Sequence, residues 1–320
     1  MDSFRPDILN YINDLRREVD ENLDELSEPQ PGTPKRLAEA MRYSLLAPGK
    51  RIRPLLTLLA ADLCGAPRNL SFPAACAVEM VHAYSLIHDD LPAMDDDPLR
   101  RGRPTCHIQF DEGTAILAGD ALLTLAFETL SHRIRPQALA GNCCAVLSEA
   151  AGAKQLVGGQ ADDLDAADNP AIAGDYDASV KFLESIHLRK TGAMIRASVR
   201  LGGLVGGVSE DHIRSLEEYG VNFGLAFQIT DDLLDWIGDE DAVGKRLRKD
   251  SEHNKLTFPG LLGVDESRCE AAEKVQKACL ALDIFKPLIE SEPTNTGGIS
   301  RRLIFDTLVA LARYLIERRN

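Results

Sequence analysis

Aromatic residues and long apolar runs are scarce in this sequence, and their absence narrows the possible folds. Phenylalanine, tyrosine and tryptophan make up only 5% of the 320 residues, and no alternating run of valine, isoleucine and threonine occurs. Both features argue against a β-rich protein. No stretch of about 18 apolar residues exists, so we expect no transmembrane helix. The opening segment, MDSFRPDILN, carries an early acid and no apolar core, so we expect no signal peptide.

Positive charge is also in deficit. The chain has 36 lysines and arginines against 50 aspartates and glutamates, which gives a formal net charge of −14. A general basic surface for nucleic acid is therefore not expected. An anionic substrate would need a local basic pocket, metal ions or both. The seven cysteines form no CxxC pair, which predicts reduced, buried thiols and a cytoplasmic location.

Helical periodicity is what the sequence does have, over almost its whole length. Between Asp7 and Leu26, apolar residues recur at steps of three and four. Thr33 is the expected N-cap of the next helix, with Pro34 at its first position. Breaks are expected at Pro48-Gly49, 98–104, Gly158-Gly159 and Lys190-Thr191-Gly192. Helices are expected at 7–26, 35–46, 52–64, 72–91, 113–132, 137–155, 178–190, 193–205, 210–237, 266–282 and 301–318.

The chain shows no sign of division into parts. No linker separates two zones of different composition, and no internal repeat is present. Some helices, such as 113–127, are apolar over most of their circumference, which is typical of buried helices at the centre of a bundle. We therefore predict one all-α domain over residues 1–320, built as a large helical bundle.

Acidic residues gather in two clusters, each after a strongly apolar helical segment. The first reads DDLPAMDDD over residues 89–97, and the second reads DDLLD over residues 231–235. In a helix, Asp231 and Asp235 share a face, with Asp232 on its flank. Carboxylates ~4 Å apart repel each other by roughly 4 kcal/mol near a protein surface, so a cation is needed to make such a face favourable. These oxygen ligands suit Mg²⁺, and two such runs favour metal sites over solvated patches.

Basic residues complement the acidic clusters. They stand in the GKRIRP segment with Lys50, Arg51 and Arg53, in Arg100, Arg101 and Arg103, at Lys190, and at Lys245 and Lys255. The GKRIRP segment opens an expected helix, whose free amides and cationic side chains suit a phosphate. Carboxylates and cations together in an acidic protein indicate a polyphosphate that is held partly by Mg²⁺ and partly by direct contacts.

The sequence contains no motif for nucleotide hydrolysis or for acyl transfer through a serine. No GxxxxGK[ST] loop and no GxSxG turn occur, so neither nucleotide hydrolysis nor a serine nucleophile is indicated. His88-Asp89 is compatible with a metal phosphohydrolase of the His-Asp type. That interpretation leaves the second acidic cluster unexplained, so we rank it low.

Several strings together resemble one known family. GKRIRP, LIHDDLPAMDDDPLRRGRPTCH, AILAGDALLTLAF, GGQADDLD and FQITDDLLD, in this order, resemble the bacterial farnesyl diphosphate synthases, which are trans-prenyltransferases. The resemblance runs from about Lys35 to Gly263. It departs at Asn254, where the family has glycine, and over 283–299, which looks like an altered connection. It implies an all-α fold of the isoprenoid synthase type, with the two acidic motifs facing each other near the mouth of a deep central cavity.

The resemblance also implies roles for individual residues. Three Mg²⁺ ions would be held by Asp89, Asp90, Asp95, Asp231, Asp232 and Asp235. The allylic diphosphate would be contacted by Arg100, Lys190 and Lys245, in a site lined by Thr191, Gln228 and Lys255. Isopentenyl diphosphate would be bound by Lys50, Arg53, His82 and Arg101. Product length would be set by Tyr84 and Ser85, because Tyr84 lies about 7.5 Å deeper than Asp89 along one helix.

The implied activity is Mg²⁺-assisted condensation of isopentenyl diphosphate with dimethylallyl or geranyl diphosphate to give farnesyl diphosphate. No enzyme nucleophile is needed, because the allylic carbon–oxygen bond ionises and apolar walls exclude water. The alternatives are a geranylgeranyl diphosphate synthase, a class I terpene cyclase and an inactive subunit that modulates a partner. A cyclase has no use for a second diphosphate site, and the intact motifs argue against an inactive subunit. The resemblance also implies a homodimer.

Overall fold

The computed structural model of the chain describes residues 4–166, 176–237, 256–291 and 299–318. Most of these residues are helical, and their only strands form a two-residue hairpin, so the all-α prediction is confirmed. In chain order the elements are α1 (Pro6–Leu26), α2 (Lys35–Leu45), α3 (Ile52–Leu63), α4 (Arg68–Asp89), β1 (Leu99–Arg100), β2 (Arg103–Pro104), α5 (Cys106–Gln109), α6 (Glu112–Arg133), α7 (Gln137–Ala151), α8 (Leu156–Ala166), α9 (Tyr176–His187), η2 (Leu188–Gly192), α10 (Ala193–Gly206), α11 (Glu210–Ile237), α14 (Phe258–Leu262), α15 (Val264–Ala281), η3 (Leu282–Phe285), α16 (Lys286–Glu290) and α17 (Arg301–Glu317).

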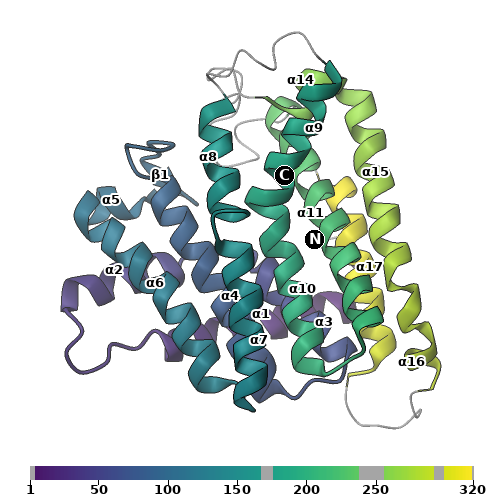
Figure 1. Ribbon diagram of the computed structural model, residues 1–320, viewed down its shortest axis with the longest axis horizontal. Helices are drawn as coiled ribbons and strands as arrows, with labels where there is room; N and C mark the ends of the chain where they lie inside the picture. The colour runs from purple at the N-terminus through teal and green to yellow at the C-terminus, as the bar shows by residue number, and fades with distance from the viewer. Residues whose placement is uncertain (1–3, 167–175, 238–255, 292–298, 319–320) are drawn as a thin grey trace.

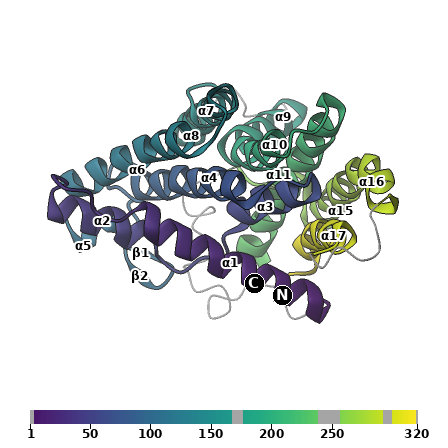
Figure 2. The same ribbon diagram turned by 90° about the horizontal axis from the view of Figure 1, so that it is seen from below.

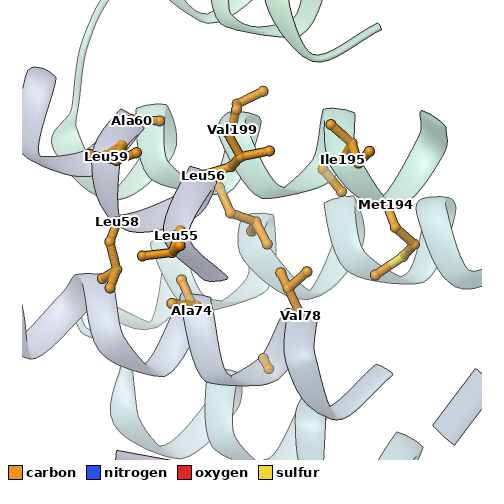
Figure 3. Close-up of a cluster of buried hydrophobic side chains, with 14 of the residues drawn as sticks. Leu55, Leu56, Leu58, Leu59, Ala60, Ala74, Val78, Met194, Ile195 and Val199 are labelled. Carbon is orange, nitrogen blue, oxygen red and sulfur yellow. The ribbon is translucent and has the colours of Figure 1, made fainter. Parts of the chain in front are cut away.

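The core forms where α3, α4 and α10 meet. Leucines of α3 interdigitate with small and branched residues of α4 and α10, and Figure 3 shows Leu56 beside Val199, with Val78 on the neighbouring helix. All three side chains are fully buried. Helix α4 also packs along α6, and α10 along α11. Because α4 and α11 are anchored by these apolar contacts, their acidic C-terminal ends are held in fixed places.

The remaining helices are arranged around this centre. Figures 1 and 2 show α2, α5 and α6 at one end of the molecule and α15, α16 and α17 at the other. Helix α11 packs against α15, and α15 packs against α17. The hairpin, α8, α9 and α14 lie in the upper part of Figure 1.

The expected helix break at 98–104 is confirmed, and it contains the hairpin. Leu99 pairs with Pro104 and Arg100 with Arg103. The two residues between the strands, Arg101 and Gly102, have φ values of 53° and 73°, as a type I′ turn requires. The turn therefore places two consecutive arginines, Arg100 and Arg101, in defined and different directions.

Two other expected breaks are wrong. Helix α8 runs through Gly158-Gly159. The lack of a Cβ at Gly159 allows the helix to pack closely against η2, because a Cβ there would lie 2.4 Å from the Lys190 amide nitrogen. At Lys190 the chain does not break either. It passes through one π-helical turn, η2, between α9 and α10. Such turns inside helices are frequent at functional sites.

The predicted cap at Thr33 is also wrong. Pro34 is the N-cap residue of α2 and no side chain caps this helix. The amide of Thr33 instead donates to the carbonyl of Gln30, which closes a turn before the helix. All seven cysteines are free, and the prediction of buried thiols is confirmed for four of them, whereas Cys144 and Cys279 are half-buried and Cys269 is exposed.

Among the described helices, α4 and α6 are long and apolar enough to span a membrane by length and composition. The test is weak, because core helices of globular proteins pass it too. In α4, 72% of the apolar window is buried inside the molecule, against 39% in α6. Helix α4 is thus a central core helix, whereas α6 leaves much of its apolar surface outward.

Candidate active site

The first acidic cluster begins at the C-terminal end of α4. Asp89 is the last residue of the helix, and its carbonyl accepts a hydrogen bond of 2.9 Å from the amide of Asp95, so the chain folds back on itself. Burial raises the pKa of Asp89 to about 6, while Lys190 lowers it and the negative charge of Asp95 raises it. The partly buried carboxylate of Asp89 is therefore held close to the exposed carboxylate of Asp95, an arrangement that favours binding of a cation.

Asp90 has a different environment from Asp89. It is buried, and the Arg100 guanidinium donates from Nε to both of its carboxylate oxygens, at 2.8 and 2.9 Å. Burial raises the pKa of Asp90, and Arg100 opposes that shift. Asp90, a predicted metal ligand, is thus paired with Arg100, a predicted diphosphate contact that the hairpin carries.

The π-helical turn η2 brings a third group of residues to the site. The Lys190 ammonium forms an ion pair of 2.6 Å with Asp163 of α8, and the adjacent Arg189 pairs with Asp162. Thr191 is buried in the same turn. Sequence analysis gave Asp163 no role in the site, but the structure places it directly on Lys190, a predicted substrate contact. The GGQADDLD string was the available signal.

The second acidic cluster ends α11. Asp231 accepts a hydrogen bond of 2.6 Å from the Arg318 guanidinium and one of 3.4 Å from the Gln228 amide. Asp232 accepts from the backbone amide of Phe258 at 2.9 Å, at the start of α14. Arg318, whose side chain is only 4% exposed, was missed by sequence analysis. Nothing in the sequence around this terminal arginine indicated that it returns to α11.

Basic residues gather beside α4, one helical turn or more before Asp89. Arg53 Nη1 lies 3.3 Å from His82 Nε2, and Arg101 Nη1 donates to the carbonyl of Pro48 at 2.7 Å. Burial, followed by Arg53, lowers the pKa of His82 well below its usual value, so the imidazole is neutral. Burial also lowers the pKa of Lys50, with Arg318 the next cause. A pocket of crowded, partly desolvated cations is suited to a polyanion.

Each acidic cluster interacts with its own group of cations. Asp89 interacts electrostatically with Lys190, and Asp231 interacts with both Lys50 and Arg53. Within the described ranges, however, no three His, Cys, Asp or Glu side chains lie close enough to form a metal site by themselves. A bound metal would therefore need oxygen atoms from a ligand as well.

Comparison with known proteins identifies this combination. The family model described as polyprenyl synthetase matches residues 34–283. The chain belongs to the polyprenyl synthetase family. The farnesyl diphosphate synthase of Escherichia coli is 42% identical over 306 residues, which cover 94% of this chain and 96% of that protein. Geranylgeranyl pyrophosphate synthase 12 of Arabidopsis thaliana is 43% identical, over 91% of this chain and 76% of that protein.

The solved structures agree with the family assignment. An FPP/GFPP synthase from Zymomonas mobilis superimposes with a TM-score of 0.80 at 33% identity and covers 97% of this chain and 98% of that one. The chain is thus a trans-prenyltransferase with the isoprenoid synthase fold, as the sequence motifs predicted. Two residues of the predicted site in this polyprenyl synthetase, Lys245 and Lys255, lie outside the described residues, as does Asn254.

The residues predicted to set product length lie on α4, as expected. Tyr84 is buried, and its ring meets the His88 ring edge-on at 5.2 Å between centroids. The His88 ring fits against α6 because Gly119 has no Cβ, which would lie 2.2 Å from His88 Nε2. Ser85 turns back to donate to the carbonyl of His82 at 3.0 Å. In this prenyltransferase Tyr84 therefore has the position and the support of a fixed wall.

Proposed function

We propose that this prenyltransferase condenses isopentenyl diphosphate with dimethylallyl and then geranyl diphosphate, and releases farnesyl diphosphate. The observation that carries the product assignment is Tyr84, a buried ring one turn below Asp89 and braced by His88. A chain that grows from Asp89 along α4 meets this ring. The farnesyl diphosphate synthase of Escherichia coli, similar along nearly the whole chain, supports the same product.

Each substrate has its own group of residues in this proposal. Lys50, Arg53, His82 and Arg101 bind isopentenyl diphosphate, whose charge offsets the crowding of these cations. Arg100, Lys190, Thr191, Gln228, Lys245 and Lys255 contact or line the site of the allylic diphosphate. The allylic carbon–oxygen bond breaks, its electron pair leaves with diphosphate, and the isopentenyl double bond attacks the remaining cation. A proton then passes to the departed diphosphate.

A divalent metal serves the family in diphosphate ionisation, and we propose Mg²⁺, three ions, for this protein. The donor set fits, because burial of Asp89 and the negative charge of the neighbouring Asp95 raise the pKa of Asp89. Asp90, Asp231, Asp232 and Asp235 complete the proposed oxygen ligands. When bound, the metal stabilises the negative charge that develops on the leaving diphosphate.

The same site accommodates a second candidate, a geranylgeranyl diphosphate synthase. The Arabidopsis thaliana relative with that name is as similar to this chain as the bacterial farnesyl diphosphate synthase. The two products differ by one isopentenyl unit, so the candidates differ in whether the Tyr84 ring stops the growing chain at farnesyl. The chemistry at the two acidic clusters is the same in both.

The proposal extends to assembly and location. Helix α6 leaves Ile116 and Leu117 exposed, the latter by 58%, and burial of this apolar helix between two copies would remove that surface from water. We therefore propose a cytoplasmic homodimer in which residues 1–320 act as one domain. Light scattering of the purified protein measures the mass of the assembly.

Product analysis tests the function directly. The purified chain is incubated with isopentenyl diphosphate, geranyl diphosphate and Mg²⁺, with a parallel sample that contains EDTA. We expect farnesyl diphosphate as the main product, and no product with EDTA until Mg²⁺ is added back. Geranylgeranyl diphosphate as the main product would support the second candidate, and activity that ignores EDTA would contradict the metal proposal.

A further inference from the structure

An arginine to which the family resemblance assigned no role holds an unusual place beside the proposed isopentenyl diphosphate pocket. Arg51 lies between Lys50 and Arg53 and is the N-cap residue of α3. Its φ of 50° and ψ of 36° place it in the left-handed region. A residue with a Cβ is strained in this conformation, so other contacts must hold the backbone there.

Those contacts come from three separate parts of the fold. The Arg51 guanidinium donates from Nε to Asp20 of α1 at 2.8 Å, from Nη1 to Glu79 of α4 at 2.8 Å, and from Nη2 to the carbonyl of Ala47 at 3.1 Å. The side chains of Arg51 and Glu79 are each only 3% exposed. Their ion pair is therefore almost fully removed from water, where loss of one partner is costly.

The ion pair fixes the direction of the neighbouring cations. Because Arg51 is tied to Ala47, Asp20 and Glu79, the backbone cannot rotate without breaking those bonds, and the carbonyl of Lys50 is held in addition by Arg16 Nε at 3.1 Å. Only Ile52 separates Arg51 from Arg53, which reaches His82. Glu79 and His82 are three residues apart on α4, so one face of that helix contacts both arginines.

Glu79 also has an electrostatic effect on the pocket. Burial lowers the pKa of Arg53 and of Arg101, and in both cases Glu79 is the strongest opposing influence. The hairpin arginine Arg101 bonds to the carbonyl of Pro48, and a Cβ on Gly49 would lie 2.3 Å from its Nη1. The buried carboxylate thus lies beneath cations that come from both the GKRIRP segment and the hairpin.

We propose that Arg51 and Glu79 are positioning residues for the isopentenyl diphosphate subsite: they touch no substrate, but they hold Lys50 and Arg53 in the geometry that binds its diphosphate. This inference rests on the proposed function. It gives Arg51 a supporting role, whereas Arg53 of the same GKRIRP segment binds the substrate.

Steady-state kinetics of Arg51→Lys and Glu79→Gln tests the proposal. Lysine keeps the charge but loses the planar fork, and glutamine keeps the size but loses the charge. We expect the KM for isopentenyl diphosphate to rise about tenfold, which corresponds to about 1.4 kcal/mol, while the KM for geranyl diphosphate and kcat stay within about twofold. Asp20→Asn, at a side chain that is 56% exposed, provides a mild variant that keeps the buried pair and should raise the same KM by about threefold.

The matched control is Asp62→Asn, at the far end of α3. Asp62 is mostly buried and pairs with Tyr11 and Arg68, away from the pocket. Its replacement should lower the melting temperature without changing either KM. If the Arg51 and Glu79 variants raise both KM values and lower kcat in proportion to lost stability, the pair has only a structural role and the proposal is overturned.

The proposed function is tested separately by the wild-type protein. If wild type forms no prenyl product, the proposed function is refuted, and calorimetric titration with inorganic pyrophosphate then decides the positioning role. Weaker pyrophosphate binding by Arg51→Lys and Asp20→Asn than by wild type supports it. Equal binding by all three proteins overturns it, whether or not Glu79→Gln folds.

Discussion

Asp89 is expected to make the ligand-free protein less stable at neutral pH than it is in acid. Its pKa is raised from 3.8 to about 6 in the folded protein, chiefly by burial. The folded state therefore binds this proton more tightly than the unfolded state. The contribution of Asp89 to stability is most favourable below about pH 4 and is lost as the pH rises through 6.

The magnitude follows from the shift. Above about pH 7 the full difference of roughly 2 pKa units corresponds to about 3 kcal/mol, and at about pH 4.5 only about 1 kcal/mol of it has developed. These values are upper limits, because the side chain keeps some contact with water. Asp89→Asn resembles the protonated acid. It should therefore unfold at a higher temperature than wild type at about pH 7.5, by an amount that shrinks toward about pH 4.5.

Thermal unfolding followed by circular dichroism, without Mg²⁺ or diphosphate, measures this difference over the pH range. Dilute samples are needed near pH 5, because the sequence pI is about 5.0. Asp14→Asn, at an exposed position of α1, is the control and should show no pH-dependent gain. The same Asp89→Asn protein should lose at least about a hundredfold in turnover. An Asp89→Asn protein that is no more stable than wild type at neutral pH would refute the account of Asp89 as a carboxylate whose burial outweighs its attraction to Lys190.

Three further predictions concern product length, the η2 turn and the second acidic cluster. Tyr84→Ala should shift the product from farnesyl to longer prenyl diphosphates in chromatography, whereas Tyr84→Phe, which keeps the ring, should not. Gly159→Ala introduces a Cβ 2.4 Å from the Lys190 amide nitrogen and should lower turnover about a hundredfold. The control, Gly141→Ala, has open space around the new Cβ and should leave turnover unchanged. Equal activity of the two variants would show that the packing of α8 on η2 does not affect catalysis. Asp232→Asn retains an acceptor for the Phe258 amide but loses the charge, so the melting temperature should change little while turnover falls about a hundredfold. Near-normal turnover would show that Asp232 is not a metal ligand.

Much of the fold could be predicted from local sequence. The spacing of apolar residues in helices such as α1 and α11 determines which face is buried, and this pattern depends on near neighbours only. The acidic clusters at 89–97 and 231–235 were visible for the same reason, because each is contiguous in the chain. Local sequence was less informative at glycines: Gly159 indicated a break, but its lack of a Cβ allows contact with Lys190, a residue 31 positions away.

The sequence by itself determined the helical class, the two acidic motifs and the basic residues that accompany them, because these depend on residue type and short-range spacing. Only the tertiary structure decided which charges meet. It paired Asp90 with Arg100, brought Arg318 to Asp231, and buried Arg51 against Glu79. Such pairs join segments that are distant in the chain, and their energies depend on burial. No spacing rule contains that information, because burial exists only after the helices have packed.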